Sequence, residues 1–325
     1  MSKMKLEDVA EYAGVSPTTV SRVLNNRGYL SEATKEKVND AIEKLGYYPN
    51  EVARSLYGSK TNLVGMLFPD VSNPFYGEMV TEIEKNLSKK GYKALLCNTS
   101  DNADKETEHL KMLLSNQVDG IVVGSRNQPS EIYKKANLAI VAIDRFVSAK
   151  VPMVRSDNYM GACLATNYLL EKNCKKIVIF IGSSEEEIKR GDLRLNGYLD
   201  TMSENSRREH IFRVSFDEEK KFQKRKISEY LDMNPDVDGI FATGDILAGM
   251  INSIVKQKKI ETEIVGYDGS DTFLSLCGDV STIRQPIKEM AQLAVKILLD
   301  SLHGNYEHEG QEYVLPVKLI EKNSH

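Results

Sequence analysis

The chain has 325 residues, more than one small core organises, and an allowance of about 100–200 residues per domain predicts two or three domains. Hydrophobic residues make up 41% of the chain and charged residues 28%, with 9 prolines, which excludes collagen-like, low-complexity and largely disordered proteins. No run approaches the ~18 apolar residues of a membrane span, and the N-terminal residues carry charges where a signal peptide has its apolar segment. We therefore expect no membrane contact and a cytoplasmic location.

Neither the cysteines nor the net charge points to a ligand or a partner. Cys97, Cys163, Cys174 and Cys277 lie far apart without CxxC spacing, which predicts reduced thiols and no metal site, disulfide or cofactor. Residues 1–60 carry a net charge of +1 and the remainder −5, which together give −4, so the first sixty residues are close to neutral. A contact with nucleic acid would therefore depend on particular side chains rather than on the overall field.

Residues 1–46 are predicted to form an all-α helix-turn-helix headpiece. An apolar stripe over Leu6–Ala13 predicts a short helix, and Gly14 supplies a turn. Ser16 is a good N-cap and Pro17 a favoured first residue, so a second short helix starts there. A third amphipathic helix follows before residue 46.

The second helix has the side chains that a helix in the DNA major groove presents from its first turns. These are Pro17, Thr18, Ser21, Arg22 and Asn25. Arg can pair with guanine and Asn with adenine, and each good pair contributes about 1–3 kcal/mol of discrimination. The alternative is that three short helices form an interaction domain in which Arg22 is solvated. Spacing alone leaves both interpretations open.

Residues 47–60 begin with a Pro-Asn helix-start signal and carry one apolar stripe that includes Ala53 and Leu56. A helix below ~12–15 residues rarely persists in water, so this one should order only against a partner. It could be ordinary linker structure. The functional interpretation is a hinge helix in the DNA minor groove, with Leu56 wedged between base pairs and Asn50 and Arg54 near the backbone.

From Leu63 onward, apolar strands alternate with amphipathic helices, which predicts an α/β body. The predicted strands are Leu63–Phe68, Tyr92–Cys97, Gly120–Val123 and Leu138–Ile143, followed by Lys176–Ile181, Ile211–Phe216, Gly239–Ala242 and Ile264–Tyr267. Their near-continuous apolar runs are typical of parallel sheets buried on both faces. Two successive sheets of about five strands fit better than one very wide sheet. A ligand cleft is expected between two such lobes, beyond the carboxyl ends of the strands.

The segments VAEYAGVSPTTVSRVLN and SEATKEKVNDAIEKLGYYPNEVARSL resemble the headpiece and hinge of the LacI/GalR family of bacterial transcription regulators. VGMLFPDVSNPFYGEMV, QVDGIVVG, SDN, LRLNGY, VGYDGS and STIRQP follow in family order, so the resemblance spans essentially the whole chain. Within the family, NNRGYLS, SLYGSK, the Asp144-Arg145 pair and SDNYMG resemble the sucrose-operon repressors of Gram-positive bacteria, with ribose-operon repressors second.

The resemblance implies a domain organisation. Residues 1–46 would form the DNA-binding domain, 47–60 the hinge helix, and 61–325 an effector-binding and dimerisation domain with two lobes similar to those of periplasmic sugar-binding proteins. The lobes would comprise about 61–157 with 286–316, and about 158–285 with 317–325.

The resemblance also implies DNA contacts. Thr18, Ser21, Arg22 and Asn25 would read the major groove, Leu56 would be the minor-groove wedge, and the full set is Leu6, Ser16, Pro17, Thr18, Thr19, Ser21, Arg22, Asn25, Tyr29, Ser31, Thr34, Asn50, Ala53, Arg54 and Leu56. Glu51 departs from a hinge position that is often neutral or basic, so we expect it to point away from DNA or to pair with Arg54 or Lys60.

Effector contacts are implied for Asp70, Ser72, Asn73, Phe75, Arg126, Asp144, Asp157, Arg194, Phe216, Asp245, Asp268 and Gln285. Carboxylates and guanidinium suit sugar hydroxyls, and Phe offers an apolar face to ring C–H groups. For a single residue such as Asp144, Asp157 or Asp245, a helix N-cap or an ion pair is the alternative. Arg194 belongs to an Arg-x-x-Gly-aromatic pattern, and Gly244 departs from a position where relatives often have Asn.

A phosphorylated effector is a further alternative at this site. Arg126, Arg145 and Arg155 could supply positive charge for a sugar phosphate, but salt bridges to nearby carboxylates explain each of them equally well.

We therefore expect a homodimeric repressor of a sugar-utilisation operon that binds a pseudo-palindromic operator and is controlled by a sugar or sugar phosphate. The alternatives are a ribose-operon repressor, a catabolite-control-type regulator with a phosphocarrier protein as corepressor, and a sugar-metabolising kinase or hydrolase. The 5 histidines show no convergent pattern, and no GxxxxGK[ST] or HExxH motif is present, so we expect no catalytic residues and no enzyme activity.

Overall fold

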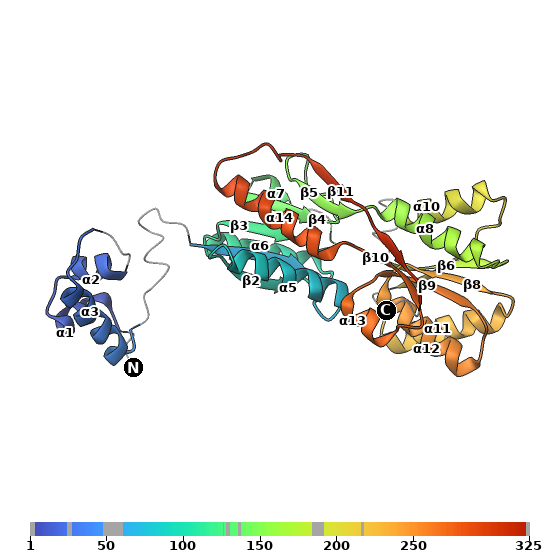
Figure 1. Cartoon of the computed structure of the whole chain (residues 1–325), viewed down its shortest axis with the longest axis horizontal. Coiled ribbons are helices and arrows are strands. Elements are labelled where there is room, and N and C mark those ends of the chain that lie inside the picture. The colour runs from blue at the N-terminus through green and yellow to red at the C-terminus, as the bar shows by residue number, and fades with distance from the viewer. Residues whose placement is uncertain are drawn as a thin grey trace. The chain divides into compact units, whose positions relative to one another are not determined.

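The structure is a computed structural model that describes residues 4–24, 28–47, 61–125, 127, 131–135, 138–183, 192–215 and 218–322. They belong to two compact units, Met1–Thr61 and Asn62–His325 (Figure 1). Among these described residues, no helix combines the length and the apolarity needed to cross a bilayer.

The first unit is all-α. Its helices are α1 (Leu6–Ala13), α2 (Pro17–Leu24) and α3 (Glu32–Leu45), which enclose a core of Val9, Ala10, Val20, Val38, Ala41 and Tyr47. Gly14 ends α1 with a φ of 65°, a left-handed conformation that glycine adopts without side-chain strain. The Ser16 hydroxyl accepts a hydrogen bond from the Thr19 N–H at 3.1 Å and caps α2. The predicted helix-turn-helix architecture is confirmed.

The first lobe of the second unit is built on a six-stranded sheet with the order β11-β5-β4-β3-β1-β2. Its strands are β1 (Leu63–Phe68), β2 (Lys93–Asn98), β3 (Gly120–Val123), β4 (Ala139–Ile143), β5 (Met153–Ser156) and β11 (Glu312–Leu315), and all pairings are parallel. Helices α5 (Pro74–Ser88) and α14 (Ile287–Leu302) bury one face. Helices α6 (Ala103–Ser115) and α7 (Glu131–Lys135) bury the other.

The second lobe repeats this arrangement with the order β12-β10-β9-β8-β6-β7. Its strands are β6 (Ile177–Ser183), β7 (Ile211–Ser215), β8 (Gly239–Ala242), β9 (Glu263–Asp268), β10 (Ser281–Arg284) and β12 (Lys318–Ile320), of which β12 is antiparallel to β10. Helices α8 (Asn158–Glu171) and α10 (Leu193–Glu204) cover one face. Helices α11 (Lys220–Met233), α12 (Asp245–Lys258) and α13 (Asp271–Leu276) cover the other.

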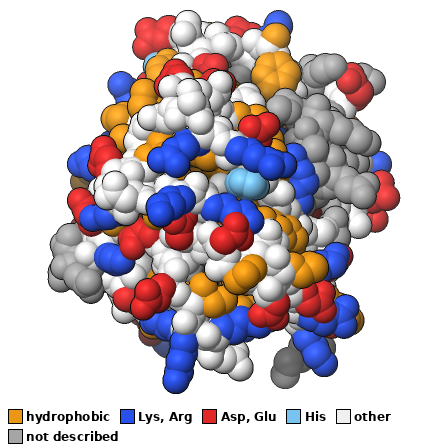
Figure 2. Space-filling view, turned by 90° about the vertical axis from the view of Figure 1, so that its right-hand side faces the viewer, with side chains coloured by type: hydrophobic (Ala, Val, Ile, Leu, Met, Phe, Trp, Pro, Cys, Tyr) orange, Lys and Arg blue, Asp and Glu red, His pale blue; other side chains and the backbone are white. Residues whose placement is uncertain are grey.

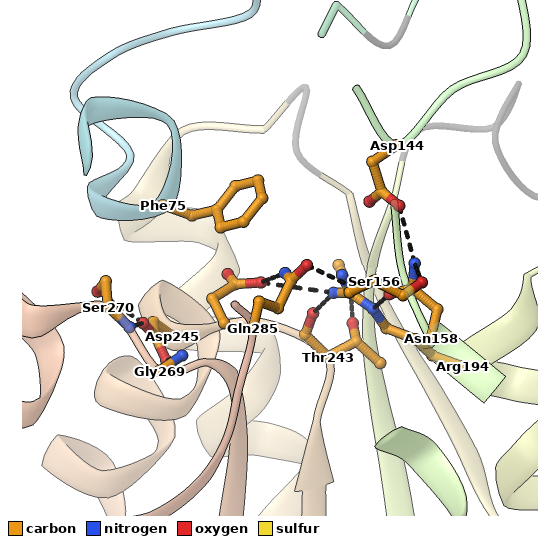
Figure 3. A network of polar contacts seen from close by, with 12 residues as sticks. Phe75, Asp144, Ser156, Asn158, Arg194, Thr243, Asp245, Gly269, Ser270 and Gln285 are labelled. Carbon is orange, nitrogen blue, oxygen red and sulfur yellow. Dashed lines mark hydrogen bonds and ion pairs between the residues drawn. The ribbon is translucent and has the colours of Figure 1, made fainter. Parts of the chain in front are cut away.

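The chain passes between the two lobes three times: from β5 to α8, from β10 to α14 and from β11 to β12. The two-lobed parallel α/β body is thus confirmed, with six strands per sheet where about five were predicted. All eight predicted strands are present, and the sequence prediction missed β5, β10, β11 and β12. The carboxyl ends of the central strands of both sheets point toward the crossings, which is where the polar residues of the candidate site lie (Figures 1 and 3).

Candidate effector site and DNA-binding surface

Helix α2 is amphipathic in the way that a groove-reading helix requires. Val20 is fully buried in the core, whereas Thr18 and Arg22 are exposed. Tyr29, beyond the end of α2, is 99% exposed. Ser31 caps α3 by accepting a hydrogen bond from Thr34 N–H at 3.3 Å. The unit therefore presents the predicted polar side chains outward, and their contacts with DNA remain a prediction.

The other predicted DNA contacts differ in exposure, and some of them lie outside the described residues. Leu6 is partly buried against the headpiece core, and Pro17 is exposed while Thr19 and Ser21 are half-buried on α2. Asn25 and the predicted hinge residues Asn50, Glu51, Ala53, Arg54 and Leu56 lie outside the described residues.

The loop after β1 uses its polar groups to fix its own shape. Asp70 accepts hydrogen bonds from the Ser72 N–H at 2.8 Å and the Ser72 hydroxyl at 2.7 Å, and these lower the pKa of Asp70. Asn73 caps α5 by accepting a hydrogen bond from the Phe75 N–H at 3.0 Å. Phe75 is itself 4% exposed and lies close to the polar network of Figure 3. Hydrogen bonds within the loop therefore fix the positions of Asp70 and Asn73 beside the site.

Arg194 is the centre of that network. Its Nε donates to Asn158 Oδ1 at 2.7 Å, and its Nη1 donates to the carbonyl oxygen of Thr243 at 2.6 Å (Figure 3). Nη1 also lies 3.8 Å from Asp268 Oδ1, and the guanidinium stacks 3.7 Å from the centre of the Tyr267 ring. A guanidinium held on this many sides has one orientation, as recognition of a fixed hydroxyl pattern requires.

The network crosses from one lobe to the other at two places. Gln285 Nε2 donates to Asp268 Oδ1 at 2.8 Å, while its Oε1 accepts from the Ser156 hydroxyl at 2.6 Å. Asn158 Nδ2 donates to Asp144 Oδ1 at 2.8 Å. Asp144 and Ser156 belong to the first lobe, so Arg194 is connected through side chains to both sheets.

Among the described residues of the site, Arg194 is a cation flanked by the carboxylates of Asp144 and Asp268. Asp144 is in contact with solvent on one side. Desolvation by the surrounding protein raises the pKa of its carboxyl group, and the positive charge of Arg194 partly offsets this rise. Burial likewise raises the pKa of Asp268, again opposed by Arg194. Burial opposes the charged form of Arg194, but Tyr267 and the two carboxylates outweigh it and raise its pKa, so Arg194 stays a cation.

Two predicted ligand residues have other partners in the structure. Asp245 is 2% exposed, and its carboxylate accepts hydrogen bonds from the N–H groups of Gly269 at 3.2 Å and Ser270 at 2.9 Å and from the Ser270 hydroxyl at 2.8 Å. Asp157 caps α8 through the Met160 N–H at 3.0 Å. Both have the structural role that was the alternative for a single Asp, and effector contacts for them remain untested. Arg126 and Phe216 lie outside the described residues.

Two of the three arginines considered for a phosphate are already paired. Arg145 is 7% exposed and forms a salt bridge with the buried Glu106 at 3.1 Å, and it also donates to the carbonyl oxygen of Asn127 at 2.8 Å. Arg155 pairs with Glu312 on the neighbouring strand β11. The salt-bridge interpretation therefore describes both residues.

Sequence reasoning did not single out Asn158, Ser156, Thr243 and Tyr267, although each contacts the network. Ser156 and Asn158 flank the end of β5, which was not recognised as a strand, and the SDN segment was their only signal. Thr243 acts through its backbone carbonyl, which carries no residue-specific signal. A Cβ at Gly244 would lie 3.5 Å from Asp268 Oδ2, an ordinary contact distance, so the packing beside Asp268 does not require glycine at this position.

The Arg-x-x-Gly-aromatic pattern has a packing explanation. A Cβ on Gly197 would lie 2.4 Å from the carbonyl oxygen of Tyr159 and 2.9 Å from Ala162 Cβ, so glycine lets α10 approach α8 closely enough for Arg194 to reach Asn158. Tyr198 is fully buried, and its hydroxyl donates to the Ile177 carbonyl oxygen at 2.9 Å.

We expect Gly197→Ala to push α10 away from α8 and to lower the free energy of unfolding by about 1–3 kcal/mol. Gly249→Ala is the matched control, because Gly249 also lies in a helix and the nearest atom to an added Cβ is 3.8 Å away. Urea denaturation of both variants measures the difference. Equal stability of the two would show that the α8–α10 contact does not require glycine.

The face shown in Figure 2 carries Lys and Arg side chains interspersed with Asp and Glu, and no broad patch of one sign forms on it. Such a surface does not attract a phosphate backbone through its field.

The fold and the site together define a two-lobed α/β binding protein that also carries a helix-turn-helix unit. Residues 61–298 match the family described as periplasmic binding proteins and sugar binding domain of LacI family, and residues 5–50 match the bacterial regulatory proteins of the lacI family. The chain belongs to the LacI family of bacterial regulatory proteins, and the resemblance noted in the sequence is confirmed.

Individual relatives agree with this assignment. The chain is 39% identical over 322 residues to the sucrose operon repressor of Pediococcus pentosaceus, with 98% of each chain covered. It is 34% identical to the ribose operon repressor of Halalkalibacterium halodurans, with 97% of this chain and 95% of the relative covered. A LacI-type regulator from Alkaliphilus metalliredigens, solved in complex with D-xylulofuranose, has a TM-score of 0.71 at 30% identity and covers 80% of this chain and 98% of its own.

Proposed function

We propose that the chain is a transcriptional repressor of a sucrose-utilisation operon, which binds its operator through residues 1–60 and responds to a sugar held between the two lobes. Membership in the LacI family supports operator binding, and the sucrose operon repressor relative supports the choice of operon. The observation that carries the sugar site is the Arg194 network, which joins both lobes at the carboxyl ends of their strands. The proposed location is the cytoplasm, where the DNA lies.

The chemistry of the network fits a sugar. The free lone pairs of Asp144 and Asp268 can accept hydrogen bonds from hydroxyl groups, and the guanidinium of Arg194 can donate to ring or hydroxyl oxygens. Phe75 supplies an apolar contact, because its ring can cover the apolar C–H face of a sugar. These groups come from elements of both lobes, so a bound sugar would favour one arrangement of the lobes over another.

The charge of the site favours an unphosphorylated sugar. Arg145 and Arg155 have carboxylate partners, whereas Asp144 and Asp268 would repel a phosphate group. We expect sucrose or fructose to raise the thermal midpoint, since a ligand at 100 times its dissociation constant stabilises the native state by about 2.7 kcal/mol. The corresponding sugar phosphates should produce a smaller shift in the same thermal-shift assay. A larger shift with the phosphates would exclude this preference.

The proposed mechanism is a homodimer on a pseudo-palindromic operator. Binding of the sugar changes the angle between lobes, and this change alters how readily the two hinge segments order on DNA. Coupling of a few kcal/mol changes the operator affinity about 10–100-fold.

Leu56→Ala tests the proposed minor-groove wedge. We expect the affinity for DNA selected by the wild-type protein from a random duplex pool to fall about tenfold or more, because the kinked groove loses its wedge. Sugar binding should stay unchanged. Fluorescence anisotropy measures the DNA affinity, and Glu51→Gln serves as the control in the same segment, with an affinity close to that of the wild type. A Leu56→Ala affinity equal to that of the control would remove the wedge from the proposal.

Two other regulators remain alternatives in the same class. A ribose-operon repressor is favoured by the relative at 34% identity. A phosphocarrier protein as corepressor gains no support from the relatives. Adding sucrose, ribose and a phosphocarrier protein separately to the DNA-binding assay distinguishes them, and only sucrose or its hexose components should change the affinity.

A further inference from the structure

A second connection between the lobes lies outside the Arg194 network, between α5 and α13. Glu78 lies on α5 one turn after Phe75, so the two residues lie on the same side of that helix. Glu78 Oε2 accepts a hydrogen bond from the Asp271 N–H at 2.9 Å, which joins residues 193 positions apart. Figure 1 shows α13 beside the end of α5.

The Asp271 side chain makes a second, weaker contact with the first lobe. Its carboxylate pairs at 3.4 Å with Lys288 of α14, a helix that packs with α5 in the core of the first lobe, and at 2.5 Å with Arg284 of β10 in its own lobe. These ion pairs are largely exposed, and such pairs stabilise little. Glu78 is half-buried, so its carboxylate is partly shielded from water. This burial raises the pKa of Glu78, and the hydrogen bond from the Asp271 N–H partly offsets the rise.

Asp271 is the last residue of a stiff segment, Asp268–Asp271, which we call the effector loop. Asp268 and Gly269 have φ values of 98° and 60°, and a Cβ on Gly269 would lie 2.6 Å from Arg284 Cα. The Asp245 carboxylate accepts hydrogen bonds from the N–H groups of Gly269 and Ser270 in this loop. These contacts hold Asp268 and Asp271 in a fixed arrangement relative to each other.

We propose that Glu78 is a positioning residue that transmits the state of the effector loop to the first lobe. This inference rests on the proposed function, because Asp268 is one of the proposed sugar contacts. A sugar that engages Asp268 shifts the effector loop, the Asp271 N–H moves relative to Glu78, and α5 follows. Glu78 touches no sugar in this scheme. Its loss separates sugar binding from the response of DNA binding.

The first test needs no ligand. Hydrogen exchange of the full-length protein, read by mass spectrometry over the peptide that starts α13, reports on the Asp271 N–H. We expect Glu78→Ala to raise exchange at this amide about tenfold, and Glu78→Gln to stay within about twofold because its amide oxygen still accepts. Glu84→Ala, an exposed residue on the same helix, is the control and should match the wild type. Unchanged exchange in Glu78→Ala would overturn the proposal.

The second test measures transmission. With sucrose as the probe, we expect Glu78→Ala to bind the sugar within about threefold of the wild type by calorimetry, while the sugar-induced change in DNA affinity falls at least fivefold. Glu78→Gln should restore that change. A full response in Glu78→Ala, despite faster exchange, would show that the contact does not carry the signal. If the wild-type protein itself responds to no sugar, the proposed function fails, and the exchange experiment still reports whether Glu78 holds the effector loop.

Discussion

Replacing Arg194 by alanine is expected to abolish the response of the protein to its sugar while leaving its affinity for DNA in the absence of sugar close to that of the wild type. The substitution removes charge-assisted hydrogen bonds, each contributing about 1.5–3 kcal/mol, so sugar affinity should fall about 100-fold or more. It also leaves Asp144 and Asp268 without the cation that opposes the rise of their pKa values. Calorimetry with sucrose and anisotropy with selected DNA measure both quantities.

Two further variants make this result specific. Arg194→Lys keeps the charge but cannot reach Asn158 and the Thr243 carbonyl together, so it should recover little of the sugar affinity. Arg225→Ala removes an arginine whose side chain is 63% exposed, and it should behave like the wild type. A sugar response of normal size in Arg194→Ala would show that the effector binds elsewhere.

Glu106→Ala should cause the largest loss of stability among substitutions in the body. Glu106 is 1% exposed and accepts hydrogen bonds from Ser125 at 2.6 Å, from Asn127 at 2.7 Å and from Tyr133 at 2.6 Å, besides its salt bridge with Arg145. Alanine leaves the buried guanidinium unpaired, and breaking a buried pair in this way costs about 3–5 kcal/mol. The urea midpoint of the protein should fall accordingly.

The exposed pair between Arg155 and Glu312 provides the comparison. Its side chains are 19% and 46% exposed, so Glu312→Ala should cost about 1 kcal/mol or less. A loss below about 1 kcal/mol in Glu106→Ala as well would mean that water or local rearrangement satisfies Arg145, and the network would not be a structural element of the first lobe.

The strands that could be predicted from the sequence are those buried on both faces. β1 and β3 are almost completely buried, and short continuous apolar runs of this kind are typical of parallel strands covered on both faces. By contrast, β5 and β11 have only four residues each. Positions in β5 alternate between half-buried and buried, and positions in β11 alternate between exposed and half-buried. Such short strands depend on pairing with neighbouring strands of the sheet. A local sequence pattern does not show which segments will become neighbours, so these strands could not be predicted.

The candidate site shows a similar division. Arg194 could be singled out because the glycine three residues later and the following tyrosine form a recognisable pattern, and the structure explains that pattern by the close packing of α10 on α8. Asp245 and Asp157 have the residue type and the position of ligands, but their carboxylates meet backbone N–H groups. Sequence spacing does not reveal which donor a carboxylate meets, because that depends on the path of a distant loop.

The most direct test of the account is the affinity of the full-length protein for DNA that it selects from a random duplex pool, measured by fluorescence anisotropy with and without sucrose or its hexose components. We expect tight binding to the selected duplex over random competitor and a change of about 10–100-fold in that affinity when the sugar is present. Equal affinity for selected and random DNA, or an affinity that no sugar alters, would contradict it.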